Sequence, residues 1–241
     1  MRGLIDTHFH LDMYRNYEEV FHYLEKEKQY TLCMTNSPGI FMSCKDLFPD
    51  SKYVQFALGF HPLNDELKLN DIKTFRHLLN STNYVGEIGL DFSKKKGLER
   101  KYQIEYFDEI VSLCAENNKL MSVHIRSAEK EALQIIDKYK PLKCIIHWYS
   151  GTLNLLYEFS KLNCFFSINA NMLKNMDIIR NIPKNKLLIE SDGPYTKIDG
   201  KKYKPQFLMR EYEVIAKALD DPELIQQVYL NFKRLLIMNY K

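Results

Sequence analysis

The sequence lacks the segments that mark membrane, secreted or multidomain proteins. No run of about 18 apolar residues occurs, so no transmembrane helix is predicted. The first residues lead from Met1 into Leu4 and Ile5 without the charged and apolar regions of a signal peptide, and we therefore expect a cytoplasmic protein. No Pro/Gly/Ser-rich linker, repeat or low-complexity segment divides the 241 residues, which predicts a single domain over residues 1–241.

Paired cysteines and a strong net charge are also absent. The five cysteines form no CxxC pair, and four of them lie inside apolar runs or helical patterns. Their odd number and placement predict buried thiols in a reducing compartment rather than disulfides or a cysteine–zinc site. The net charge is only +3, so it neither requires nor excludes a nucleic-acid partner, and the distribution of charge is more informative.

Short apolar runs, mostly separated by helical patterns, occupy the chain instead. Several runs are almost continuously hydrophobic, which is typical of parallel strands covered on both faces. We expect strands at Leu4–Asp6, Tyr30–Thr35, Tyr53–Leu58, Tyr84–Ile88, Leu120–His124, Cys144–His147, Cys164–Ile168 and Leu187–Glu190. We expect helices at Tyr17–Lys28, Leu98–Asn118, 129–139, 152–162, 205–219 and 223–239. This alternation predicts a parallel sheet with crossover helices.

The alternation fits a closed TIM-type (β/α)8 barrel or a doubly wound open sheet. Candidate ligands follow six of the eight predicted strands, including the first and the last. An open sheet gathers ligands from only two or three strands at a switch point, whereas a barrel brings all strand ends together. We therefore predict an α/β barrel, distorted at its second βα unit. There, Ser37–Pro49 is short and has proline and glycine near its start, so we expect a helix of one or two turns.

Histidines and acids at the strand ends form a candidate metal site. His8 and His10 are two residues apart, so a strand would point both imidazoles the same way. Glu87 would lie in the barrel mouth, where a carboxylate needs a partner, and it could bridge two cations. His124 and His147 end adjacent predicted strands, and imidazole is a general ligand for transition metals.

Two further residues complete the candidate site. Asp192 follows the eighth predicted strand, which closure would place beside the first, and its carboxylate can bind a metal and accept a proton from water. Glu190 competes for this role but lies farther from the loops. His61 precedes Pro62 after the third strand, where we expect it to contact a substrate oxygen. Taken singly, each of these residues also fits a hydrogen-bonded polar group, a salt bridge or a cap.

In this order, the motifs resemble the TatD family of metal-dependent deoxyribonucleases, within the amidohydrolase-like barrel superfamily. The resemblance runs from Ile5 to about Leu236 and rests on IDTHFHLD, GFHP, VGEIGLDF, VHIRSA, HWYSG, ESDGPY and NFKRLL. It implies a TIM-type barrel with two divalent ions of Mg, Mn or Zn. It implies a first ion held by His8, His10, Glu87 and Asp192, and a second held by Glu87, His124 and His147. The implied activity is hydrolysis of DNA phosphodiesters, as a 3′-to-5′ exonuclease on single strands.

The chain departs from the family pattern in a few loops. Gly193 precedes Pro194 where the family usually has alanine, and the fifth-strand motif reads His-Ile-Arg rather than His-Ser-Arg or His-Cys-Arg. None of these changes removes a candidate ligand. Some small members of the family accompany genes for defence against phage, and this context stays open here.

The resemblance indicates a chemistry in which two cations hold the attacking and leaving oxygens of a phosphodiester. Asp192, Glu87 and His61 are the predicted catalytic residues, and Arg126 offers a planar fork of donors to phosphate. Two lysine-rich loops, Ser93–Lys96 and Lys197–Lys204, should lie on the same face. We expect Lys201, Lys202 and Lys204 to follow a DNA backbone, and Tyr195 and Tyr203 are candidates for base stacking.

Two other classes of function compete. The same scaffold serves deaminases, lactonases, amidases and aminoacyl-ester hydrolases, many of which bridge their metals with a carbamylated lysine on the fourth strand. This chain has Glu87 there, which favours the nuclease. A non-catalytic binding module would be expected to have lost a ligand, and the sequence has lost none.

Overall fold

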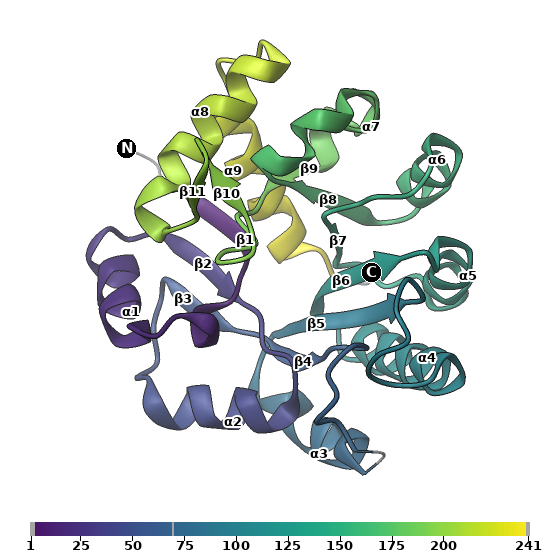
Figure 1. Cartoon of the computed structure of the whole chain (residues 1–241). Helices are drawn as coiled ribbons and strands as arrows, with labels where there is room; N and C mark the ends of the chain where they lie inside the picture. The colour runs from purple at the N-terminus through teal and green to yellow at the C-terminus, as the bar shows by residue number, and fades with distance from the viewer. Residues whose placement is uncertain (1–2, 69, 240–241) are drawn as a thin grey trace.

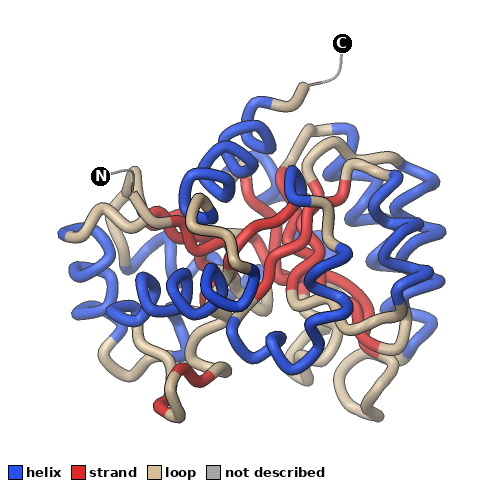
Figure 2. Tube along the Cα trace, turned by 90° about the horizontal axis from the view of Figure 1, so that it is seen from above, coloured by secondary structure: helices blue, strands red, loops and turns tan. Residues whose placement is uncertain are grey.

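The computed structural model, which describes residues 3–68 and 70–239, has its parallel strands at the centre and its helices outside them (Figures 1 and 2). The central strands are β1 (Ile5–Phe9), β2 (Tyr30–Cys33), β3 (Val54–Phe56), β4 (Leu58–Phe60), β5 (Tyr84–Asp91), β6 (Leu120–Arg126), β7 (Cys144–His147), β8 (Cys164–Ile168) and β9 (Leu187–Ile189). They form two parallel sheets, ordered β1-β2-β3 and β4 to β9. All eight predicted strands are present, although the third divides at Ala57 into β3 and β4.

The ring of strands closes between β1 and β9. Thr7 Oγ1 donates a hydrogen bond to the carbonyl oxygen of Ile189 over 3.0 Å. Just beyond the strands, the Asp192 amide donates to His8 O and the His10 amide to Gly193 O, both over 2.9 Å. The first and last strands therefore lie side by side, and the predicted TIM-type barrel is confirmed.

The barrel is irregular where β3 meets β4. Thr35, two residues beyond β2, donates through Oγ1 to Ala57 O over 2.8 Å and accepts there from the Gly59 amide over 3.1 Å. A Cβ atom at Gly59 would lie 1.6 Å from the Thr35 carbonyl oxygen, so only glycine permits this approach. The Thr35 backbone also pairs with Gly86 and Glu87 of β5. The distortion therefore lies in the strands and holds Glu87 in place.

The helices surround the strands in the order α1 (Tyr17–Lys26), α2 (Pro38–Leu47), α3 (Asp71–Leu78), α4 (Arg100–Glu116), α5 (Glu129–Tyr139), α6 (Leu153–Lys161), α7 (Met176–Asn181), α8 (Leu208–Leu219) and α9 (Leu224–Ile237). Short 3₁₀ helices are η1 (Leu11–Met13), η2 (Leu79–Ser81), η3 (Ala170–Asn175), η4 (Lys184–Lys186) and η5 (Pro205–Phe207). A hairpin of β10 (Lys197–Ile198) and β11 (Lys201–Lys202) follows β9. The sequence reading missed α3 and α7, of eight and six residues, because so few residues give a weak periodic signal.

The prediction of only one or two turns for the second helix was wrong. α2 contains ten residues, which is nearly three turns. Ser37 caps it by accepting a hydrogen bond from the Ile40 amide over 3.2 Å. Pro38 occupies the first turn, where its missing N–H costs nothing and its fixed φ favours the helix. The proline therefore starts this helix instead of shortening it.

Apolar side chains fill the barrel and the layer between strands and helices. Leu188, Ile146 and Phe166 on three neighbouring strands are fully buried. All five cysteines are free and buried, as predicted. Within the described part of the chain, no helix is long and apolar enough to cross a membrane.

Candidate metal centre

The strand alternation directs the predicted ligands into one cleft at the carboxyl ends of the strands. Along β1, Asp6, His8 and His10 share one face, and along β6 Ser122 and His124 do the same. The cleft has a volume of about 880 Å³ and is lined by residues that include His10, His61, Glu87, His124, His147 and Asp192. His8 lies beneath them, fully buried. The structure thus brings together every candidate ligand that the sequence analysis named.

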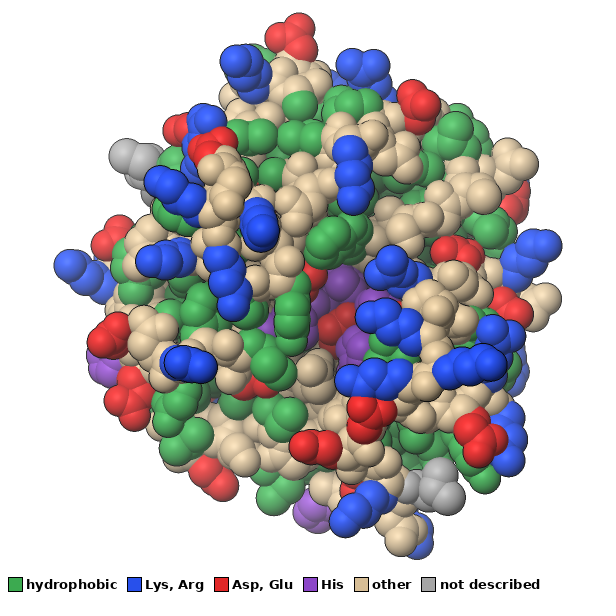
Figure 3. Space-filling view, viewed as in Figure 1, with side chains coloured by type: hydrophobic (Ala, Val, Ile, Leu, Met, Phe, Trp, Pro, Cys, Tyr) green, Lys and Arg blue, Asp and Glu red, His purple; other side chains and the backbone are tan. Residues whose placement is uncertain are grey.

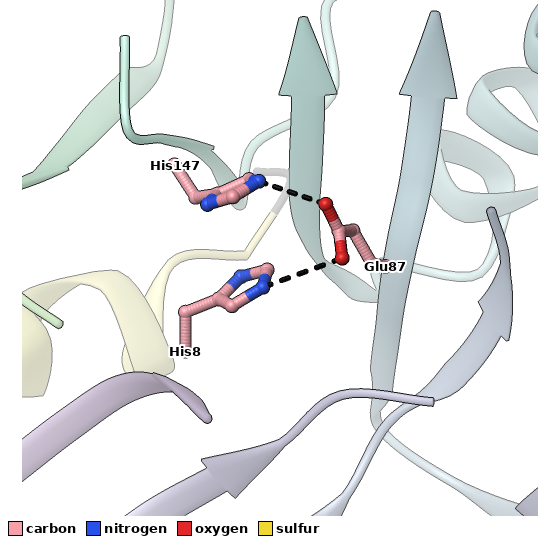
Figure 4. Close-up of side chains that lie close together, drawn as sticks. All are labelled: His8, Glu87 and His147. Atoms are coloured by element: carbon pink, nitrogen blue, oxygen red, sulfur yellow. Dashed lines mark hydrogen bonds and ion pairs between the residues drawn. The ribbon is translucent and has the colours of Figure 1, made fainter. Parts of the chain in front are cut away.

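Glu87 lies at the middle of this group, with its two carboxylate oxygens facing different histidines. The pairing of β5 with β6 is irregular between Val85 and Ile88, and such bulges commonly re-aim a side chain next to a functional site. Oε1 is 2.9 Å from His147 Nε2, and Oε2 is 3.5 Å from His8 Nε2 (Figure 4). The side chain is 5% exposed, so both oxygens depend on these neighbours rather than on water.

The first set of ligand atoms surrounds Oε2 of Glu87. His10 Nε2 lies 3.4 Å from this oxygen and 3.4 Å from Asp192 Oδ1. His8 Nε2 lies 3.2 Å from His10 Nε2 and 3.8 Å from Asp192 Oδ1. Two imidazole nitrogens and two carboxylate oxygens from three separate strand ends thus face one point.

The second set surrounds Oε1 of Glu87. His124 Nδ1 and His147 Nε2 are each 2.9 Å from this oxygen and 3.2 Å from each other. His61 Nε2 also approaches it, at 3.3 Å. The two sets share only Glu87, so this carboxylate connects them.

Neighbouring polar groups fix which histidine nitrogen faces the centre. Asp91 Oδ2 is 3.0 Å from His124 Nε2. An ionised carboxylate only accepts hydrogen bonds, so His124 Nε2 carries the proton and Nδ1 presents its lone pair to the centre. Ser122 Oγ lies 2.8 Å from His8 Nδ1, where it can accept a hydrogen bond from Nδ1–H and leave the lone pair of His8 Nε2 free. The sequence analysis missed both Asp91 and Ser122.

His61 has the opposite tautomer. Its Nδ1 accepts a hydrogen bond from the Leu63 amide over 3.1 Å, so the proton of the neutral ring is on Nε2. This N–H points at Glu87 and into the cleft, where it acts as a hydrogen-bond donor. A metal ligand would need a lone pair there. The geometry therefore separates His61 from the four other histidines.

Glu190, the alternative to Asp192, faces away from the centre. It is fully buried and accepts hydrogen bonds from Ser167 Oγ and, over 2.9 Å, from Asn169 Nδ2. Its Oε2 lies 3.7 Å from His147 Nδ1, on the side of that ring opposite Glu87. Glu190 thus supports His147 from behind, while Asp192 faces the cleft.

In the absence of a cation, protons on the histidines balance the negative charge of the carboxylates. Burial opposes a positive charge on His10, but Asp192 and Glu87 raise the pKa of His10 to about 10. Burial also opposes charge on His147, yet Glu87 and Glu190 raise the pKa of His147 well above its ordinary value. Although burial favours the neutral acid, His61 and His147 hold the pKa of Glu87 well below its usual range. The centre is therefore built to hold positive charge beside an ionised Glu87.

This donor set fits divalent cations. His8 Nε2 and His10 Nε2 are 3.2 Å apart, and so are His124 Nδ1 and His147 Nε2. Two facing lone pairs repel each other unless a proton or cation lies between them. Because Zn–N bonds are about 2.0–2.1 Å long, one ion can join nitrogens up to about 4 Å apart. Combined imidazole and carboxylate ligands suit Zn and Mn, and the cysteines lie elsewhere in the core.

Basic side chains gather along one rim of the cleft. Figure 3 shows histidine and acidic side chains at the bottom of a hollow, with Lys and Arg side chains beside it. Arg126, the predicted phosphate contact, lines the cleft together with Lys94, Lys96 and Lys174. The predicted backbone contacts Lys201, Lys202 and Lys204 are exposed and lie outside the cleft lining, on or just after the β10–β11 hairpin.

The two tyrosines considered for base stacking differ in position. Tyr195 is 57% exposed and lines the cleft, with its ring edge-on to His10 at 5.2 Å between centroids. Tyr203 is 1% exposed and packs against Phe9, so the expectation that it stacks on bases was wrong. A Cβ at Gly193 would lie 2.4 Å from Tyr203 Cδ1. This buried tyrosine therefore explains why position 193 is a glycine in this chain.

Comparison with known proteins agrees with the fold and shows the family. The sequence profile described as TatD related DNase matches residues 5–237. The "Uncharacterized metal-dependent hydrolase BU355" of Buchnera aphidicola is 29% identical, over 96% of this chain and 98% of that protein. The "Uncharacterized metal-dependent hydrolase YcfH" of Escherichia coli K12 is 28% identical, over 96% and 95%. The crystal structure of YJJV, a TatD homologue from Escherichia coli K12, superimposes with a TM-score of 0.85 at 20% identity, covering 96% of this chain and 97% of that one. The profile match over almost the whole chain shows that the protein belongs to the TatD related DNase family of metal-dependent hydrolases.

Proposed function

We propose that the protein is a divalent-metal-dependent nuclease that hydrolyses DNA phosphodiester bonds with two ions, from the 3′ end of single strands. The observation that carries this proposal is the position of Glu87. Its Oε2 faces His8 and His10, and its Oε1 faces His124 and His147. A carboxylate shared between two sets of imidazoles is suited to bridge two cations.

We assign one ion to His8, His10, Asp192 and Oε2 of Glu87, and the other to His124, His147 and Oε1 of Glu87. When bound, such ions neutralise charge on the phosphodiester and make water a better nucleophile at neutral pH. Asp91 fixes the tautomer of His124, and Ser122 can accept from His8 Nδ1–H, so both histidines would present a lone pair to such an ion. Ligating histidines are neutral, so cation binding releases the protons that they otherwise hold.

Asp192 acts as a proton acceptor and His61 as a hydrogen-bond donor beside the reacting phosphate. Asp192 reaches the centre from beyond β9, and its carboxylate accepts a proton from the attacking water. The new oxygen–phosphorus bond forms as the bond to the leaving sugar oxygen breaks, and that oxygen takes a proton from solvent. His61 carries its proton on Nε2 and would offer this N–H to a phosphate oxygen.

The basic rim favours a polyanionic substrate. Arg126, Lys94 and Lys174 line the cleft, and we assign Arg126 and Lys94 to the phosphates next to the cleaved bond. Lys201, Lys202 and Lys204 extend this positive surface outside the cleft, so we assign them to more distant phosphates. The five free thiols suit a reducing compartment, and we propose a cytoplasmic location.

A direct assay tests the proposed function. Metal-free protein is incubated with single- and double-stranded DNA, labelled at either end, and Mg²⁺, Mn²⁺ or Zn²⁺ is added in turn. We expect cleavage only after metal is added, faster on single strands, with products that shorten from the 3′ end. Absence of DNA cleavage with every metal, together with hydrolysis of an amide, lactone or aminoacyl ester, would contradict the proposal.

The salt dependence of DNA binding distinguishes the basic residues that line the cleft from Lys201, Lys202 and Lys204 outside it. Phosphate contacts release counterions, so each lost contact should reduce the log–log salt slope of single-strand binding by about 0.7. We expect Lys201→Glu, Lys202→Glu and Lys204→Glu together to make the slope shallower only for long oligonucleotides. Lys94→Glu should do so for short ones as well. Equal slopes for the triple variant and the wild type on long DNA would exclude these three lysines from the binding surface.

A further inference from the structure

The only tryptophan of the chain lies at the cleft. Trp148 directly follows His147 at the end of β7, is half-buried and forms part of the cleft lining. A tryptophan at this position is not required by the ligand set, because His147 alone reaches Glu87. The indole therefore calls for an explanation of its own.

The backbone at Trp148 adopts an unfavourable conformation. Its φ is +39°, in the left-handed region that bulky residues rarely occupy. Such a conformation persists only where the surrounding structure imposes it, and it is concentrated at functional sites. Here both neighbours are fixed. His147 contacts Glu87 at 2.9 Å, while Tyr149 packs edge-on against Phe159 and Phe166 and donates to Thr152 O over 2.8 Å.

The indole packs against the edge of the hydrophobic core and also lines the cleft. Within residues 3–68 and 70–239, no aromatic ring stacks on Trp148 and no acceptor binds its Nε1–H. Its anchored neighbours turn away into the metal centre and the core, while the part of the indole that is not packed against the core faces the cleft. A planar aromatic surface beside a centre for phosphate chemistry suits a planar ligand.

We propose that Trp148 is the stacking platform for the nucleobase next to the cleaved phosphate. The inference rests on the proposed nuclease function and adds a residue that selects the substrate. Every base has an aromatic face, so stacking on Trp148 is tolerant of sequence. A base can reach the indole only when it is unstacked from its neighbours. Trp148 thus favours single strands and frayed ends over intact duplex.

A comparison of intact and abasic substrates tests the platform. In a series of oligonucleotides, each strand carries a single abasic residue, placed one position farther from the cleaved bond than in the strand before. Because alanine substitution of a stacking residue costs about 1–3 kcal/mol per base, we expect Trp148→Leu to lower kcat/KM about 5- to 150-fold on the intact strand. On the strand that lacks the stacked base, the same substitution should lower kcat/KM by less than about twofold. Trp148→Phe, which keeps an aromatic face, should retain most of the activity.

Tyr157→Ala is the matched control. Tyr157 is 50% exposed on α6 and lies outside the cleft lining, so this variant should behave like the wild type on every substrate. Equal losses by Trp148→Leu on intact and abasic strands would overturn the platform. So would a wild-type enzyme that cleaves both strands at one rate. A wild type that cleaves no DNA would instead contradict the proposed function.

Fluorescence provides a readout that does not depend on any Trp148 variant. The chain has one tryptophan, so its indole emission reports on Trp148 alone. In the Asp192→Asn background, which should bind DNA but cleave it about 10²-fold or more slowly, adding an intact oligonucleotide should quench this emission. An oligonucleotide abasic at the stacked position should quench it far less. Binding, measured separately by anisotropy, without a change in indole emission would refute stacking.

Discussion

Asp91 offers a sharp test of how the protein sets the tautomer of a metal-binding histidine. Its Oδ2 accepts from His124 Nε2 over 3.0 Å, and its Oδ1 accepts from the amide and hydroxyl of Ser93 over 2.8 and 2.6 Å. Both oxygens therefore act as acceptors. Asparagine has almost the same shape but only one acceptor oxygen. Whichever way its amide turns in Asp91→Asn, one of these two interactions is lost.

The expected loss of metal affinity follows from this geometry. If the amide nitrogen faces His124, it demands the lone pair of Nε2 and moves the ring proton to Nδ1, which faces Glu87 2.9 Å away. Loss of such an outer-shell partner typically weakens metal binding about 10- to 100-fold. This range corresponds to roughly 1.4–2.7 kcal/mol, since each factor of ten is about 1.4 kcal/mol.

The assay is a calorimetric titration of metal-free protein with Zn²⁺ or Mn²⁺. We expect Asp91→Asn to weaken the binding of the ion beside His124 and His147. The affinity for the ion beside His8 and His10 should stay nearly unchanged. Ser93→Ala is the control, because it keeps the His124 hydrogen bond and the Ser93 amide. Identical isotherms for wild type and Asp91→Asn would refute the role of Asp91 as a positioning residue.

Three further predictions concern the centre and its support. Asp192→Asn should keep a melting temperature near that of the wild type but lower the rate about 10²-fold or more, and unchanged kinetics would exclude a general base there. Gly193→Ala should destabilise the fold by about 1–3 kcal/mol in denaturant unfolding, because its Cβ would lie 2.4 Å from Tyr203 Cδ1, and a wild-type midpoint would contradict this. Burial raises the pKa of Glu211 from 4.5 to about 8, so the folded state binds more protons than the unfolded state between these values. Its contribution to stability is present below pH 4.5 and is lost as pH rises towards 8, at about 1.4 kcal/mol per unit. Glu211→Gln, which stays neutral, should therefore flatten the dependence of the melting temperature on pH over this range, and an unchanged profile would count against it.

Most of the barrel could be predicted from the sequence because its strands are buried on both faces. The strand β7 was predicted with its observed bounds, Cys144–His147, and so was β8, Cys164–Ile168. These runs contain little but apolar residues, which a covered parallel strand requires. The length of the second helix was predicted wrongly because proline and glycine near the start of a short segment were read as limiting it, although Pro38 in the first turn is a start signal.

The candidate metal ligands could be predicted for a similar physical reason, whereas the residues that hydrogen-bond to them were missed. Strand ends converge in a barrel, so His and Asp residues there could be grouped without knowing any distance. Asp91 and Ser122 follow the same two-residue alternation as Glu87 and His124 on their own strands, so this period could have identified them. The positions of Lys201 and its neighbours could not be predicted, because a loop has no repeating period to indicate its direction.

The central claim is that Glu87 joins two metal ions. Its most direct test is the metal content per chain, measured by elemental analysis of wild type and Glu87→Ala after reconstitution and removal of excess metal. The account predicts two ions per wild-type chain, and one or none in the variant together with loss of hydrolysis. Two ions and normal activity in Glu87→Ala would contradict it.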